Sequence, residues 1–142
     1  MRIVLDTAAF IAALRSEAGA SRRLLIASLE RRLTLILSVP LLIEYEAVAV
    51  RPEHLDRAGL SVEEVGVVLD ALAAVAEPVR LSFLWRPTLR DANDDMVLET
   101  AVNGRADGIV TFNIRDFAAA RERFGVQIFS PRQAWEKLET GR

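Results

Sequence analysis

Short runs of apolar residues alternate with longer segments whose apolar residues recur every three or four positions. Continuous apolar runs lie at 2–5, 33–37, 108–111 and 126–129, and a weaker, alternating run lies at 78–83. Continuous runs of this length predict strands that are covered on both faces. The segments between them have helical spacing. Strands that alternate with helices predict a parallel sheet with helices on both faces.

Turn and capping residues indicate where several of the helices begin. An alanine-rich segment at 8–14 predicts the first helix, and a break at Gly19 precedes a second helix, for which Ser21 is a candidate cap. Pro40 suits the first turn of a third helix, and Ser130-Pro131 precedes the closing one.

The middle of the chain contains two polar stretches. Residues 51–59 predict a polar connection, and a capping box formed by Ser61 and Glu64 then opens a helix that runs to about residue 76. Residues 85–94 predict a loop. The next helix is expected to start at Asp94 or Asp95 and to end at Gly104.

These elements predict a three-layer α/β/α fold with a central, mostly parallel sheet of four to five strands. The length of 142 residues favours a single domain over 1–142, and 51% hydrophobic residues suffice for a buried core. The chain has no cysteine and only one histidine, His54, which excludes disulfides, thiolate metal sites and multi-histidine sites. No signal peptide is recognisable, and no apolar run approaches the roughly 20 residues of a membrane span. We therefore expect a cytoplasmic protein that does not enter a membrane.

Acidic side chains follow the predicted strands where those strands end. Asp6 follows the first strand, Glu44 lies beyond the second, and Asn113 and Asp116 follow the fourth. Asp95 opens the helix that leads into the fourth strand. Right-handed crossovers place the ends of parallel strands at one edge, where ligands bind. Crowded carboxylates repel one another unless a cation neutralises them, so the pattern predicts a site for a divalent metal such as Mg²⁺.

Each of these residues also has a plain structural interpretation. Asp6 suits a helix N-cap, and Glu44 suits a solvated helix position. Asp91 and Asp94 compete with Asp95, and one of the three is expected to cap the helix. Asn113 and Asp116 suit a turn, and Thr111 suits a polar strand end. The joint placement of these residues favours the metal site more than any one of them does.

Four segments, in order, resemble the PIN-domain nucleases, in particular the branch described as toxin components of toxin–antitoxin systems (VapC-like). They are Val4-Leu5-Asp6-Thr7, Leu42-Ile43-Glu44-Tyr45, residues 91–99 and residues 106–117. The resemblance covers nearly the whole chain. It implies a PIN-like fold and a hydrolase that cleaves RNA phosphodiester bonds with Mg²⁺ or Mn²⁺.

The resemblance also implies roles and partners. Asp6, Glu44, Asp95 and Asp116 would be the catalytic, metal-binding quartet, supported by Thr7, Thr111 and Asn113. A cognate antitoxin and a second copy of the chain are the expected protein partners. The RNA target and its contacts are not predicted, although six arginines are candidates for the phosphate backbone and Trp85 for base stacking: Arg15, Arg22, Arg23, Arg86, Arg90 and Arg115.

One departure from the family pattern leaves alternatives open. Members usually carry Asn or Ser after the Asp-Thr pair, and this chain has Ala8, which cannot hydrogen-bond to the site. A catalytically weakened PIN-like binding module is therefore an alternative. A receiver-type signalling domain is a weaker one, because the only lysine, Lys137, lies deep in the closing helix. A dehalogenase-type phosphatase would need a second aspartate at position 8.

Overall fold

The computed structural model describes residues 1–82, 89 and 91–141. Its strands form one five-stranded parallel sheet. The strand order is β3-β2-β1-β4-β5, and every neighbouring pair runs parallel. The strands are β1 (Arg2–Leu5), β2 (Thr34–Leu37), β3 (Glu77–Pro78), β4 (Gly108–Val110) and β5 (Gln127–Phe129). The predicted parallel sheet is confirmed, with β1, the first strand in sequence, at its centre.

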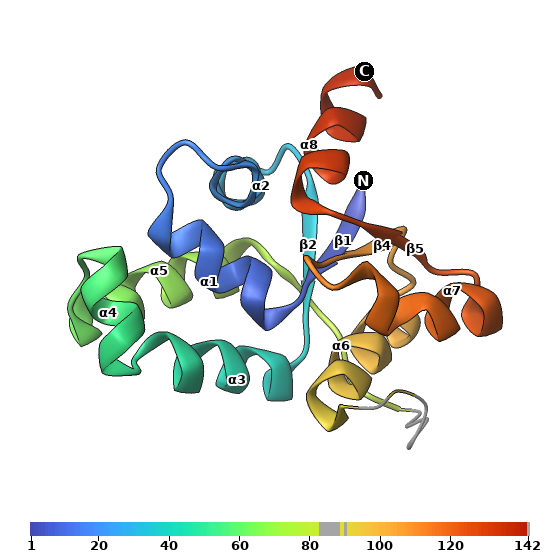
Figure 1. Cartoon of the computed structure of the whole chain (residues 1–142), viewed down its shortest axis with the longest axis horizontal. Helices are drawn as coiled ribbons and strands as arrows, with labels where there is room; N and C mark the ends of the chain where they lie inside the picture. Colours follow the sequence, from blue (N-terminus) through green and yellow to red (C-terminus); the bar gives the residue numbers. More distant parts are fainter. Residues whose placement is uncertain (83–88, 90, 142) are drawn as a thin grey trace.

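Helices cover both faces of this sheet. They are α1 (Thr7–Arg15), α2 (Ala20–Leu29), α3 (Val39–Ala49), α4 (Pro52–Ala58), α5 (Val62–Val75), α6 (Ala92–Asn103), the 3-10 turn η1 (Ile114–Phe117), α7 (Ala118–Phe124) and α8 (Pro131–Thr140). Figure 1 shows α1 to α5 gathered on one side of the sheet and α6 and α7 on the other. The three-layer α/β/α fold of the prediction is confirmed. None of the helices in the described ranges has the length and apolarity that a bilayer crossing requires.

The three inner strands are buried because their side chains face helices on both sides. Ile3, at the centre of β1, lies beside Leu35 of β2 and Gly108 of β4, and Ile109 lies beside Ile128 of β5. Their apolar side chains are at most 5% exposed. This burial explains why the strands appear in the sequence as continuous apolar runs.

Polar residues directly after three strands are the N-caps of the following helices. Asp6 caps α1, Ser38 caps α3 and Ser130 caps α8, each with a side-chain oxygen that accepts a backbone N–H of the first turn. Because strand, cap and helix follow one another without a loop, these polar side chains gather at the carboxyl edge of the sheet.

Two segments differ from the sequence prediction in the central region. Residues 51–59 contain the helix α4, not an irregular connection; Pro52 occupies its first turn and Gly59 ends it at a φ of 67°. The third strand is only Glu77–Pro78 instead of 78–83, although Val79 still donates to the Leu37 carbonyl at 2.8 Å. Position 83 and half of the predicted loop (85–88 and 90) lie outside the described residues.

Other differences concern helix starts. Gly19, not Ser21, is the N-cap of α2, and the Ser21 hydroxyl is buried. The helix α6 begins at Ala92, because Asp91 caps it. Between the last two strands, η1 and α7 were not predicted. Only Phe117 and Ala120 are buried there, so the segment has little apolar periodicity to reveal it.

Candidate functional site

The candidate site lies where the connections change direction in the sheet. From β1 the chain moves outward through β2 to β3, and from β4 it moves the other way to β5. Ligands of open α/β sheets bind beyond the carboxyl ends of the strands at such a switch point. Asp6 follows β1 there, and its backbone N–H donates to the Val110 carbonyl of β4 at 3.0 Å. The ends of the two central strands are therefore joined directly beneath the predicted acids.

Asp6 is a helix cap and a member of the site at once. Its Oδ1 accepts the Ala9 N–H at 2.8 Å, and its Oδ2 accepts the Thr111 hydroxyl at 2.5 Å. The Thr111 oxygen in turn accepts the Asn113 N–H at 2.9 Å. Burial raises the pKa of Asp6, and the hydrogen bonds from Thr111 and Ala9 offset part of that rise. The carboxylate is thus held in one orientation from both of its oxygens.

Asp94 is the carboxylate on which charges from several segments converge. It is the third residue of α6 and half-buried. Burial, together with repulsion from Asp91, Asp6, Asp116 and Asp95, raises its pKa from 3.8 to about 6. One acidic group therefore receives side chains from three places in the fold: the end of β1, the start of α6, and η1.

Asp95 is oriented differently from Asp94. Its side chain is only 2% exposed, and its Oδ1 accepts the Leu89 N–H at 2.8 Å. Asp91 caps the helix through the Asn93 N–H at 2.8 Å, as one of the three acids was expected to do. In the sequence, Asp94 is only a competitor of Asp95 for the ligand role. Three acids within one helical turn give no sequence signal that separates their directions.

The other two predicted ligands of the acidic group, Asp116 and Glu44, come from η1 and from α3. Asp116 is exposed on η1, where its N–H donates to the Asn113 carbonyl at 3.0 Å, and it is among the charges that raise the pKa of Asp94. Glu44 is half-buried on α3 and is not among those charges. Thr7, at the first position of α1, is half-buried beside Asp6.

Tyr45 is a supporting residue that the sequence argument did not identify. Its fully buried hydroxyl donates to the Leu5 carbonyl at 2.6 Å, and its ring stacks on Phe10 with centroids 4.3 Å apart. Burial, and then the charge of Asp6, raises the pKa of Tyr45 well above 10, so it stays a neutral donor. One side chain thereby ties α3 and α1 to the residue before Asp6. In the sequence, the one sign of this role is that Tyr45 carries a hydroxyl on an otherwise apolar face of the predicted helix.

The candidate RNA-binding arginines divide into structural and exposed ones. Arg22 donates to the Ala13 and Leu14 carbonyls, so it completes the end of α1. Arg23 lies over the Trp135 ring at 5.9 Å. Arg15 and Arg115 are exposed. Three further candidates lie outside the described residues: Trp85, Arg86 and Arg90.

The acidic group fits a hard divalent cation by its chemistry. Its members offer only oxygen donors, which Mg²⁺ and Mn²⁺ prefer. A cation would relieve the repulsion that, after burial, contributes to the raised pKa of Asp94. Within residues 1–82, 89 and 91–141, no three His, Asp or Glu side chains are placed so that they could hold one ion. The side chains as they stand are therefore a set of suitable donors and not a closed coordination shell.

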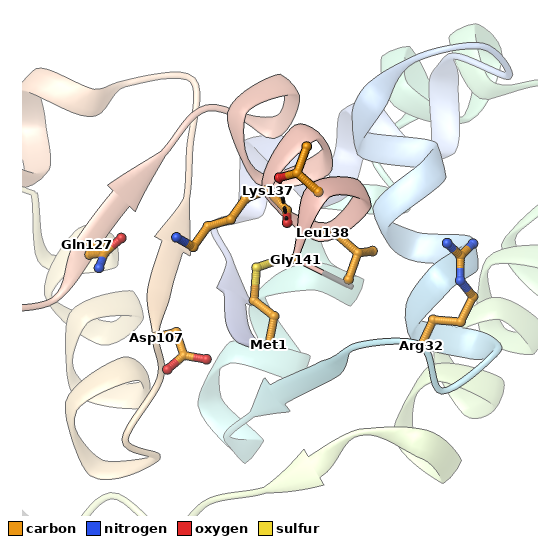
Figure 2. Close-up of a pocket in the computed structure, with 8 residues that line it drawn as sticks. Met1, Arg32, Asp107, Gln127, Lys137, Leu138 and Gly141 are labelled. Atoms are coloured by element: carbon orange, nitrogen blue, oxygen red, sulfur yellow. Dashed lines mark hydrogen bonds between the residues drawn. The ribbon is translucent and has the colours of Figure 1, made fainter.

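A hollow of about 780 Å³ lies at the opposite edge of the sheet. Met1, Asp107 and Gln127, at the beginnings of β1, β4 and β5, line it, and Figure 2 shows Lys137 from α8 reaching into it. This hollow is not part of the acidic group, because the two lie at opposite edges of the sheet, one strand length apart.

Fold and site together define an α/β domain that gathers acidic side chains at the switch point of a parallel sheet. A family model for the PIN domain matches residues 2–115, and the chain belongs to the PIN-domain family, whose members are generally nucleases. The matched range contains Asp6, Glu44, Asp94 and Asp95 and ends one residue before Asp116. No curated protein matches the chain. The resemblance found in the sequence is confirmed at the level of the family.

Proposed function

We propose that this protein is an endoribonuclease that hydrolyses RNA phosphodiester bonds with the help of Mg²⁺ or Mn²⁺. The observation that carries the proposal is the PIN-domain match over residues 2–115, with Asp6 and Asp94 among the acids at the carboxyl edge of the sheet. Burial, and then repulsion from Asp91, Asp6, Asp116 and Asp95, raises the pKa of Asp94 there. An RNA phosphate is itself anionic. A group of carboxylates can accept it only with a cation between them.

The residues of this chain would bind and orient the reacting groups. Asp6, Asp94 and Asp116 would hold the cation, with Asp95 and Glu44 as further predicted ligands. A cation held by these residues would supply polarisation of a phosphoryl oxygen and a more acidic water at neutral pH. Thr111 and the Ala9 N–H keep the Asp6 carboxylate from rotating. Asp94 carries a proton below a pH of about 6 and is a carboxylate above it.

The nuclease is tested with single-stranded RNA at pH 7.5. We expect cleavage with Mg²⁺ or Mn²⁺, none in EDTA, and a loss of at least a hundredfold in Asp6→Asn and Asp94→Asn. Asp70→Asn is the matched control, since it removes one exposed aspartate from α5 without touching the acidic group. Cleavage that persists in EDTA, or that is unaffected in Asp6→Asn, would overturn the metal mechanism.

We also propose that the nuclease is the toxin of a toxin–antitoxin pair, that it acts in the cytoplasm and that it forms a homodimer. Apolar side chains on the surface support a protein interface: Val39, Ile43 and Val67 are 69%, 61% and 68% exposed. Induced expression of the wild type should arrest growth of the host cell, and expression of Asp94→Asn should leave growth unaffected. Light scattering should give twice the 15.7 kDa of one chain. Unimpaired growth on expression of the wild type would contradict the toxin role. A monomer at micromolar concentration would contradict the homodimer.

A second candidate is a PIN-like module that binds its partner without cleaving RNA. The observation in its favour is Ala8, which is exposed beside Asp6 and offers no polar atom. Calorimetry with Mn²⁺ separates the two candidates. Saturable binding in the low millimolar range that is lost in Asp94→Asn supports the nuclease, and no heat of binding supports the inert module.

A further inference from the structure

A second hollow, of about 450 Å³, adjoins the acidic edge on the side of α1. One face of α1 forms its floor with Thr7, Ile11 and Arg15, and Val48 of α3 and His54 of α4 form one wall. Phe112 closes it from the segment after β4. The volume is within the range of small-molecule sites in proteins.

Three lining residues of this hollow are neighbours of candidate site residues along the chain or on the same helix face. Thr7 directly follows Asp6, and Phe112 directly follows Thr111. Val48 lies one turn after Glu44 on α3, so the two side chains share a helix face. A strand of RNA whose phosphate lies at the acids therefore has the hollow beside its next nucleotide.

The lining combines apolar walls with an exposed aromatic ring. Ala8, Ile11 and Val48 present only hydrocarbon, and Phe112 is 57% exposed although it follows a fully buried strand end. Exposed aromatic rings of this kind provide the surface on which unpaired bases stack, and every base has a face that can do so.

Two polar groups complete the lining. His54 lines the hollow, and its buried Nδ1 has no hydrogen-bond partner within the described part of the chain. Arg15 is exposed at the other end of α1, nine residues and roughly 14 Å from Asp6 along the helix. A positive charge at that distance suits the phosphate on the far side of a base that lies in the hollow.

From this arrangement we propose that the hollow is a subsite for one unpaired base of the RNA, next to the scissile phosphate. The inference rests on the proposed nuclease function. The base stacks on Phe112, its polar edge faces His54, and Arg15 contacts the following phosphate. The hollow therefore contributes substrate affinity and a preference for one position in the strand.

The subsite is tested with short RNA oligonucleotides of one sequence in which each position in turn is abasic. We compare the wild type with Phe112→Ala, with Ala12→Leu, which fills the hollow, and with Ile26→Ala, a control that removes a 44% exposed apolar side chain from α2. Cleavage is measured with Mn²⁺, and binding is measured by fluorescence anisotropy with Ca²⁺.

We expect one position at which the abasic substitution lowers kcat/KM of the wild type by about tenfold to a hundredfold. Phe112→Ala and Ala12→Leu should lose a similar factor on the intact oligonucleotide and little more on the abasic one, because the two changes remove the same contact. Ile26→Ala should behave as the wild type does.

Failure of the subsite and failure of the nuclease give different results. Cleavage that does not depend on a base at any position, or an equal loss in Phe112→Ala on intact and abasic RNA, overturns the subsite and leaves the hollow to an apolar segment of a protein. Base-dependent binding without cleavage overturns the nuclease and supports the subsite.

Discussion

Replacing Asp94 with asparagine should stabilise the metal-free protein while weakening its response to metal. Burial, and then repulsion from Asp91, Asp6, Asp116 and Asp95, disfavours the charged form of Asp94, and its pKa is therefore about 6 instead of 3.8. Between these two values the folded protein binds more protons than the unfolded chain does. Its stability consequently falls as the pH rises through this window, and the full penalty remains above a pH of about 6.

The magnitude follows from the size of the shift. A change from 3.8 to about 6 is worth at most about 3 kcal/mol at roughly 1.4 kcal/mol per pH unit. Asp94 is only half-buried, so solvent screening reduces the realistic gain to about 1 kcal/mol. For a chain of 142 residues this corresponds to a rise in Tm of about 3 °C.

The assay is thermal unfolding of wild type and Asp94→Asn at pH 7.5 and pH 4, in EDTA and in 10 mM Mg²⁺. In EDTA at pH 7.5 the variant should melt about 3 °C higher, and at pH 4 the difference should shrink, because Asp94 of the wild type is then protonated. Mg²⁺ at about ten times its Kd should stabilise the wild type by roughly 1.4 kcal/mol. The variant should gain much less, so the order of the two proteins reverses.

Asp70→Asn is the control, since it removes the same charge from an exposed position of α5 and should change the stability by less than about 0.5 kcal/mol. A lower Tm of Asp94→Asn in EDTA at pH 7.5 would refute the argument from repulsion. Equal stabilisation of both proteins by Mg²⁺ would refute the assignment of Asp94 to the cation.

Three further substitutions test the supporting structure. Tyr45→Phe should lower the free energy of unfolding by about 1–2 kcal/mol in urea titrations, because it removes the buried bond to the Leu5 carbonyl; an unchanged midpoint would contradict this. Glu77→Gln should cost under about 1 kcal/mol at pH 7 and low salt, and progressively less in acid. The hydrogen bond from Arg2 lowers the pKa of Glu77 in the folded protein. The ion pair therefore contributes its full stability above the unfolded pKa of 4.5, and this stability is lost as the pH falls through the lowered pKa of the folded state. A cost of Glu77→Gln that does not depend on pH would exclude the ion pair as its source. Gly66→Ala should stabilise α5 by about 0.5–1 kcal/mol, since a Cβ there meets nothing within 4 Å, and a lower Tm would show otherwise.

The central strands and their caps could be predicted because several sequence signals agree there. Buried strands such as β1 and β4 are continuous apolar runs, and Asp6, Pro40 and the Ser61–Glu64 capping box mark helix starts directly. The helices α4 and α7 left weaker signals. In α4 no residue is fully buried, so apolar periodicity cannot reveal it, and its start and stop residues also occur in turns.

At the site, sequence order located the edge but not the directions of side chains. Asp6 and Asp116 lie where the strand ends predict, and electrostatic coupling relates both to α6. Within α6, Asp94 and Asp95 are adjacent and differ by about 100° around the helix axis, so one is buried against Leu89 while the other meets the remaining acids.

The central place of β1 in the sheet has a consequence for the synthesis of the protein. The first strand to leave the ribosome pairs along one side with β4, whose residues Gly108 to Val110 are made late. Until then Asp6 lacks its bonds to Val110 and Thr111, and one edge of β1 stays open. A chain proposed to cleave RNA is thus made without its assembled acidic group. Any activity at this edge therefore has to wait until β4 has been made and has paired with β1.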